Sequence, residues 1–129
     1  MTESIIPEEV ARFVLDNIYS VAHLEALLLL HSNPDQAWSA SRLAARLYIS
    51  EEQTAELLLA LRAQGLIAEK AQQPGSFEYK PASTDLDLMI KRLAQIHAKH
   101  LVPITNLIHS KPKPRIQEFA DAFRLRKGE

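Results

Sequence analysis

The residues of this sequence that could carry out chemistry are spread along the chain. His97 and His100 lie three apart in a helical pattern, a spacing that lets two imidazoles bind one metal ion, and His109 follows on a similar side. A third ligand would have to come from elsewhere, because no acidic residue lies between Asp87 and Glu118. We therefore interpret these histidines as interface or partly buried residues and expect no metal site.

The sequence also lacks the loops and nucleophiles of the common enzyme classes. It has no cysteine, which excludes disulfide scaffolds, cysteine nucleophiles and the usual zinc fingers. It has three glycines, and none of them forms a Gly-x-Ser-x-Gly, Walker-type or Gly-x-Gly-x-x-Gly loop. We therefore expect neither enzymatic activity nor a cofactor.

Length, composition and charge describe a folded chain with a polarised charge distribution. The 129 residues are 47% hydrophobic and 24% charged, close to the globular average, which suits one hydrophobic core. We see no membrane span or secretion signal and expect a cytoplasmic protein. Residues 1–60 carry three bases and nine acids, a net charge of −6, whereas residues 61–129 carry twelve bases and seven acids, a net charge of +5.

Apolar residues recur mainly at helical spacing, so most of the elements that position these residues are predicted to be helices. A first helix is predicted from Pro7, and a second from Ser20 to the turn at residues 33–35. A short helix is predicted over residues 38–47, with Ser39 able to cap it. Trp38, just before this cap, is either a ligand-stacking aromatic or a staple against the core, and we favour the staple.

Capping and turn residues define the elements in the middle of the chain. Ser50 and Gln53 have capping-box spacing, so a helix is predicted over residues 51–64, with Gly65 as its left-handed stop. Two short strands are predicted at 66–71 and 76–80, because a Pro-Gly turn separates them. The middle of the chain is therefore helix, tight turn, helix and hairpin.

Residues 38–81 resemble the winged helix-turn-helix of bacterial transcriptional regulators, in the general cast of the multiple-antibiotic-resistance-regulator group. The most specific piece is Leu58-x-x-Leu61-x-x-x-Gly65-Leu66-Ile67. The resemblance implies a domain over residues 1–83, with a helix-turn-helix at 39–64 and a wing at 66–80. Residues 51–64 then match the recognition helix. The implied fold is mainly α with a small β-hairpin wing, and the implied function is a DNA-binding transcriptional regulator.

Binding to double-stranded DNA needs free cations along the phosphates and polar side chains at the start of the recognition helix. Glu51, Glu52 and Glu56 oppose this at the leading positions, and Leu59 is apolar where DNA readers are usually polar. The alternative is a protein–protein interaction module that docks through its acidic recognition helix, without DNA. The candidate DNA-contacting residues are Arg42, Arg46, Gln53, Glu56, Arg62, Lys70 and Lys80.

The C-terminal third is predicted to form one long amphipathic helix over residues 84–110, started by a box-like pair at Thr84 and Asp87 and kinked at Pro103. Residues 111–129 read as a basic linker and an amphipathic tail. The apolar stripe exceeds what one small domain readily covers, so we expect a homodimer. The candidate dimer residues are Leu86, Met89, Ile90, Leu93, Ile96, Leu101, Ile104, Phe119 and Phe123.

Overall fold

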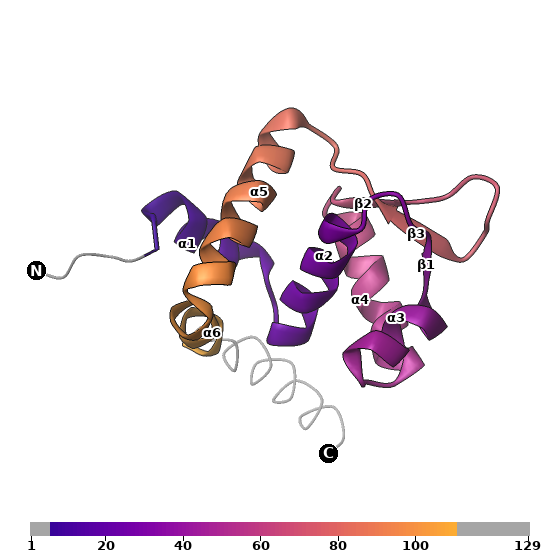
Figure 1. The fold of residues 1–129 in the computed structure, drawn as a ribbon, viewed down its shortest axis with the longest axis horizontal. Helices are drawn as coiled ribbons and strands as arrows, with labels where there is room; N and C mark the ends of the chain where they lie inside the picture. Colours follow the sequence, from indigo (N-terminus) through magenta and orange to yellow (C-terminus); the bar gives the residue numbers. More distant parts are fainter. Residues whose placement is uncertain (1–5, 111–129) are drawn as a thin grey trace, which may run out of the picture.

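The computed structural model describes residues 6–110, which form a mainly helical fold with a small antiparallel sheet (Figure 1). This level of the expected fold class is confirmed. The six helices and three strands within that range are, in chain order, α1 (Glu8–Asn17), α2 (Val21–Ser32), β1 (Trp38–Ser39), α3 (Ala40–Leu47), α4 (Glu51–Ala63), β2 (Ile67–Glu69), β3 (Ser76–Tyr79), α5 (Thr84–Lys99) and α6 (Leu101–His109).

Serine side chains set the starts of four helices. Ser20, Ser39, Ser50 and Ser83 each accept a hydrogen bond from the amide three residues further on, at 3.0–3.1 Å. The first three caps confirm the sequence pattern. The box-like start at Thr84 was wrong by one residue, because Ser83 is the cap of α5 and Thr84 is already helical. Local hydrogen bonding thus fixes where α2, α3, α4 and α5 begin.

A tight turn joins α3 to α4 at the predicted place. Tyr48 takes the left-handed conformation, with φ 60° and ψ 41°, and its amide donates to the carbonyl of Ala44 at 2.8 Å. The capping box at the start of α4 is only half formed. The amide of Gln53 donates to Ser50, but the Ser50 hydroxyl, rather than its amide, lies 3.4 Å from the Gln53 side-chain oxygen.

The sheet contains a strand that the sequence did not reveal. Its order is β1-β3-β2, with Trp38 opposite Phe77 and Ile67 opposite Tyr79 in antiparallel register. The predicted helix over residues 38–47 was therefore wrong at its start, since Trp38 and Ser39 pair with β3. The hairpin of β2 and β3 confirms the two predicted strands, which are shorter than expected.

Two glycines take the left-handed conformations that their turns require. Gly65 has φ +77° after α4, and Gly75 has φ +85° between β2 and β3. A Cβ atom on Gly65 would lie 3.3 Å from that of Ala82. The helix stop and the hairpin turn were both predicted from these residues.

The single long helix predicted over residues 84–110 was wrong, because the chain breaks at His100. His100 has φ −133° and ψ 57°, and α5 ends before it while α6 begins after it. Pro103 explains the break: it has no amide to offer the carbonyl of Lys99, and its ring would crowd that carbonyl in a continuous helix. In α6, Pro103 instead occupies the first turn, where amides have no intrahelical partner.

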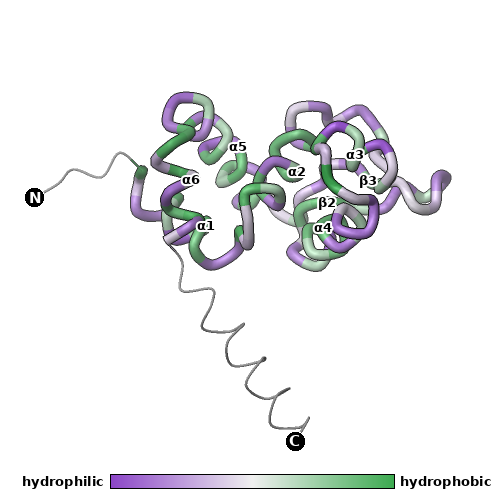
Figure 2. Tube along the Cα trace, turned by 90° about the horizontal axis from the view of Figure 1, so that it is seen from below, coloured by the Kyte–Doolittle hydropathy of each residue, from purple (hydrophilic) through white to green (hydrophobic). Residues whose placement is uncertain are grey.

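α2 is the central helix of the fold. Figure 2 shows α1, α5 and α6 on one side of it and α3, α4 and the sheet on the other. α2 contacts α3, α4, β3 and α5, and α6 packs against both α1 and α5. An ion pair between Arg92 of α5 and Glu9 of α1 adds to this packing. One hydrophobic cluster runs through both sides, so residues 84–110 share a core with the preceding part of the chain.

No single helix within residues 6–110 is long and apolar enough to cross a membrane. α1 and α2 pass that test only when they are taken together, and they are bent by 112° at their junction.

Candidate functional site

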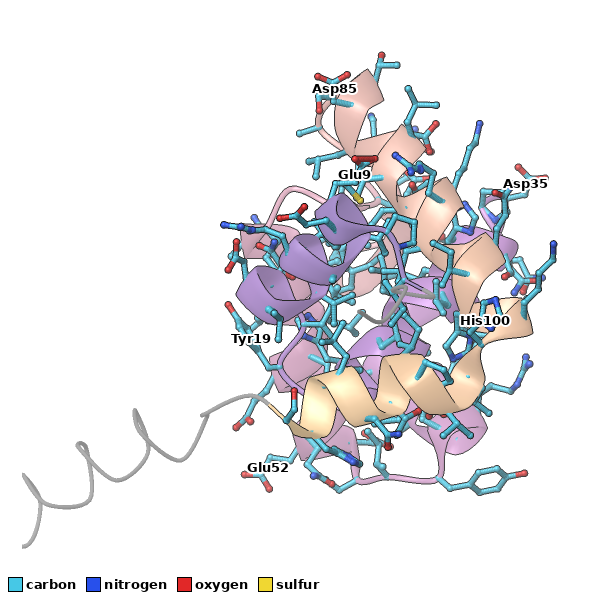
Figure 3. The ribbon with its side chains drawn as sticks, turned by 90° about the vertical axis from the view of Figure 1, so that its left-hand side faces the viewer. Glu9, Tyr19, Asp35, Glu52, Asp85 and His100 are labelled. Atoms are coloured by element: carbon cyan, nitrogen blue, oxygen red, sulfur yellow. The ribbon has the colours of Figure 1, made fainter. Side chains whose placement is uncertain are left out.

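The outward face of α4 begins with three carboxylates. Thr54, Leu58 and Leu61 turn inward and are buried, and the Thr54 hydroxyl donates to the Ser50 carbonyl at 2.8 Å. The helical period therefore turns Glu51, Glu52 and Glu56 to solvent, where all three are exposed. In Figure 3 Glu52 lies at the edge of the molecule and points away from it. The first turn of α4 thus presents concentrated negative charge.

The same face carries apolar surface one turn further on. Leu59 is 57% exposed, and Ala55 is also exposed. Glu52, Glu56 and Leu59 stand at i, i+4 and i+7, which places them along one side of the helix. We call the face formed by Glu51, Glu52, Ala55, Glu56 and Leu59 the α4 face. It combines carboxylates with an exposed leucine.

Arg42 of α3 is bound within the chain. Its guanidinium lies 4.1 Å from the centre of the Trp38 ring, and it donates to the carbonyl of Ala37 at 2.7 Å and to the side-chain oxygen of Gln36. Arg46, one turn later, lies 5.8 Å from the centre of the same ring. These contacts are cation–π interactions that hold the start of β1 against α3. Trp38 itself is fully buried, which confirms its interpretation as a core staple.

The bases of α4 and the hairpin face acids of the hairpin. Arg62 lies 3.7 Å from a carboxylate oxygen of Glu69, and Lys70 lies 3.5 Å from one of Glu78. The other oxygen of Glu69 accepts a hydrogen bond from the amide of Gly75 at 2.7 Å. Both bases were candidates for phosphate contacts, and the structure brings each to a carboxylate instead.

Three further candidates for DNA contacts are exposed and have no acidic partner among residues 6–110. Gln53 stands in the first turn of α4, Arg46 at the end of α3, and Lys80 directly after β3. Within residues 6–110 no ion pair involves Arg46 or Lys80. The seven candidate DNA residues therefore divide into three bases that are bound within the chain, Arg42, Arg62 and Lys70, and four exposed residues, Arg46, Gln53, Glu56 and Lys80.

Most of the predicted dimer residues in the described range belong to the chain's own core. Ile90, Leu93 and Ile104 are fully buried, so their side chains are not available at the surface. Leu86, Met89 and Ile96 are partly buried against the same core, whereas Leu101 is 53% exposed. The physical reason is the break at His100, which folds α6 back onto α1 and α5. Phe119 and Phe123 lie outside the described residues.

The histidines considered for metal binding do not form a cluster with acids. In the part of the chain that the structure describes, no group of three or more His, Asp or Glu side chains is placed to hold a metal ion. His97 lines a surface groove on α5, and His100 occupies the break between α5 and α6.

A polar cluster connects the two sides of the fold at the end of α2. The Tyr79 hydroxyl donates to a carboxylate oxygen of Asp87 at 2.8 Å, and the Lys91 ammonium lies 3.6 Å from the other oxygen. Burial and the Asp87 bond raise the pKa of Tyr79. His31 packs edge-on to Tyr79, with ring centres 5.0 Å apart, and burial lowers the pKa of His31. Sequence reasoning missed this cluster because the fold brings His31 to Tyr79, which lies 48 positions further along the chain.

Sequence reasoning also missed a groove between α2, the end of α3 and α5. It has a volume of about 580 Å³. Its floor is apolar, and Tyr48 stands at its margin with 91% of its surface exposed. The run of four leucines at residues 27–30 was a partial signal, because one helix cannot bury leucines on every side.

A scan against protein-family models and searches of curated proteins and of solved structures each found no match to this chain.

Proposed function

We propose that this chain is a winged-helix-like interaction module that docks a protein partner on its α4 face. The observation that carries the proposal is the charge of that face: three exposed carboxylates stand on the first half of α4, which carries no base. The order of helix, tight turn, helix and hairpin supports the winged-helix interpretation of the fold. In this interpretation α4 is the recognition helix and the β2–β3 hairpin is the wing.

Electrostatics favour a protein over a nucleic acid on this face. Affinity for duplex DNA comes largely from cations that replace the counterions of phosphates. Arg62 and Lys70 already face Glu69 and Glu78, and Arg42 is held against Trp38. Recruiting the two paired bases to phosphates would leave the hairpin acids near the polyanion. The carboxylates of α4 would add to that repulsion.

The chemistry of the face defines the partner. Carboxylates at the first half of α4 attract lysine or arginine, and Leu59 offers an apolar contact about two turns further along the helix. A complementary segment carries basic residues followed by a large apolar side chain at helical spacing. We therefore infer a basic amphipathic segment of another protein as the partner.

The test is binding of a labelled synthetic helix of lysine and leucine, compared with the same peptide carrying glutamate in place of lysine. The full chain should bind the basic peptide in a salt-sensitive way and not the acidic one. E51Q/E52Q/E56Q should weaken binding roughly tenfold, if each exposed pair contributes about 0.5 kcal/mol. Fluorescence anisotropy measures both affinities.

The matched control removes three exposed carboxylates elsewhere. Asp16, Asp35 and Asp85 are exposed, and Figure 3 shows Asp35 and Asp85 far from Glu52 on the molecule. D16N/D35N/D85N has the same net charge as the α4 variant and should bind the basic peptide like the wild type. Equal losses in the two variants would attribute binding to net charge and overturn the α4 face as a specific site.

A second candidate function is a DNA-binding transcriptional regulator that acts as a homodimer. It is favoured by the exposure of Gln53, Arg46 and Lys80, which have no acidic partner within residues 6–110. Gln53 stands where a recognition helix reads bases, and glutamine pairs well with adenine. The remaining cations would anchor phosphates from the end of α3 and from the wing.

An electrophoretic shift assay at low salt separates the two functions. On the docking proposal, neither the wild type nor E51Q/E52Q/E56Q shifts a mixed-sequence duplex at micromolar protein. On the regulator hypothesis, the wild type shifts it, the glutamine variant shifts it more strongly, and K70A/K80A binds all sequences less tightly with a shallower salt dependence. A shift with that pattern would overturn the docking proposal.

A further inference from the structure

The groove beside α3 has an apolar floor and charged margins. Leu28 and Leu29 of α2 and Leu47 of α3 line it together with Ala94 and Ala98 of α5. The small alanines leave the hollow, because they do not fill the space between α2 and α5. Covering this apolar floor with another apolar group removes it from water and lowers the free energy of the system.

Tyr48 projects from the margin of this groove in an unusual backbone conformation. Its φ of 60° lies in the left-handed region, which glycine and asparagine enter more readily than a residue with a bulky side chain. The side chain is nevertheless 91% exposed, so packing among residues 6–110 does not account for a tyrosine here. An aromatic ring held out from a tight turn can instead be covered by another molecule.

Opposite charges stand on different walls of the groove. Glu25 comes from α2 and Arg46 from the last turn of α3, and no ion pair joins either of them to another residue in the described range. The face therefore contains a protruding ring and a hollow, and it contains both a carboxylate and a guanidinium. A two-fold interface requires such a face, because the same surface must supply each group and its complement.

We propose that this face is a two-fold interface between two copies of the chain. Tyr48 of each copy enters the groove of the other, and Arg46 meets Glu25 of the partner subunit on both sides of the axis. This interface differs from the dimer expected through the C-terminal stripe, whose central residues are buried within the chain. It also goes beyond the proposed function, since none of these residues belongs to the α4 face.

The first experiment measures mass by light scattering with the full-length chain at micromolar to millimolar concentration. The wild type should reach twice 14.5 kDa as concentration rises. Y48G removes the ring and suits the left-handed turn, so it should remain folded by circular dichroism and stay monomeric. A wild type that stays monomeric, or a Y48G variant that dimerises like the wild type, would overturn the interface.

The second experiment tests the ion pairs by mixing two variants. In a dimer of E25R, two arginines face each other at both contacts, and in a dimer of R46E two glutamates do. Each variant should therefore dimerise roughly tenfold more weakly than the wild type. In a mixture, the two arginines of E25R face the two glutamates of R46E, so mixed dimers should form. A mixture no more dimeric than its components would refute the contact between copies, because a pair within one chain cannot be restored by mixing.

The remaining controls address other occupants and the separate role of α4. F119S/F123S changes the apolar tail and should dimerise like the wild type; loss of the dimer in this variant, with Y48G unaffected, would assign the association to residues 111–129. Y48G should bind the basic peptide as the wild type does. Failure of the dimer would therefore leave the proposed docking function standing, and failure of peptide binding would leave the dimer standing.

Discussion

The α3–α4 unit and the α5–α6 pair both carry amphipathic helices with buried and exposed apolar residues, but the charges beside the exposed ones differ. In α5 and α6, Ile90, Leu93 and Ile104 are fully buried against the rest of the chain. Leu101 and Val102 are 53% and 64% exposed, on a helix that carries no acid. In α4, Leu58 and Leu61 are buried in the same way, but Leu59, which follows three exposed carboxylates on the same helix, is 57% exposed. An apolar stripe therefore does not by itself indicate a partner, and an exposed leucine that adjoins a group of carboxylates is the more informative observation.

The largest expected effect tests this difference by deleting one side chain from each region. I104A removes most of a fully buried side chain from the contact of α6 with the core and should lower the free energy of unfolding by about 2–5 kcal/mol. L59A on α4 should change it by about 0.5 kcal/mol or less, because its site is largely in water. Urea unfolding measures both.

The outcome for L59A also bears on the proposed partner. The same variant should weaken binding of the basic amphipathic peptide while the fold keeps its stability. A loss of stability as large as that of I104A would show that Leu59 belongs to the core, and the comparison between the two regions would fail.

The elements that the sequence pattern predicted closely are those that depend on local signals. The starts of α2, α3 and α4 depend on Ser20, Ser39 and Ser50, each of which bonds to an amide three residues away. Such signals lie within one turn of helix. The hairpin likewise depends on Gly75, whose positive φ is a local property. Elements decided by neighbouring residues were therefore predicted closely.

Elements decided by distant residues were missed. β1 exists because Trp38 pairs with Phe77, 39 positions further along the chain. The placement of α6 depends on packing against α1, which no pattern within residues 84–110 contains. In the candidate site, the partners of Arg62 and Lys70 lie seven and eight positions further along, and the ion pairs depend on the packing and register of the hairpin, which the pattern did not specify. The sequence showed which bases exist, and the tertiary structure determined which of them meet an acid among residues 6–110.

A smaller effect is expected from removing one local signal in the α3–α4 unit. S50A deletes the oxygen that accepts the Gln53 amide at 3.0 Å and should lower the free energy of unfolding by about 1 kcal/mol. S41A, at an exposed position inside α3, is the matched control and should be neutral or slightly stabilising, since alanine favours helix. Chemical denaturation that gives the two variants equal stability would mean that the cap does not determine the start of α4.

The smallest expected effect is the pH dependence of stability that His31 contributes, at the junction where the two regions meet through α2. His31 is half-buried at the end of α2, edge-on to Tyr79 of β3 and near Asp87 of α5. Burial lowers the pKa of His31 below its usual 6.5, the Lys91 charge lowers it further, and the Asp87 charge opposes both. The packing of the two regions therefore disfavours a proton on this ring.

The sign of the pH dependence follows from that shift. Above the unfolded pKa the ring is neutral in both states and contributes nothing. As the pH falls through about 6.5, the unfolded chain binds the proton before the folded chain does, so stability is lost until the lower folded pKa is reached. H31F keeps an aromatic ring against Tyr79 and removes the titration. Its free energy of unfolding should match the wild type near neutral pH and fall less steeply between about pH 7 and about pH 5, in urea unfolding repeated across that range. If the two curves run parallel, His31 takes up its proton equally in both states, and the junction is open to water rather than packed between the two regions.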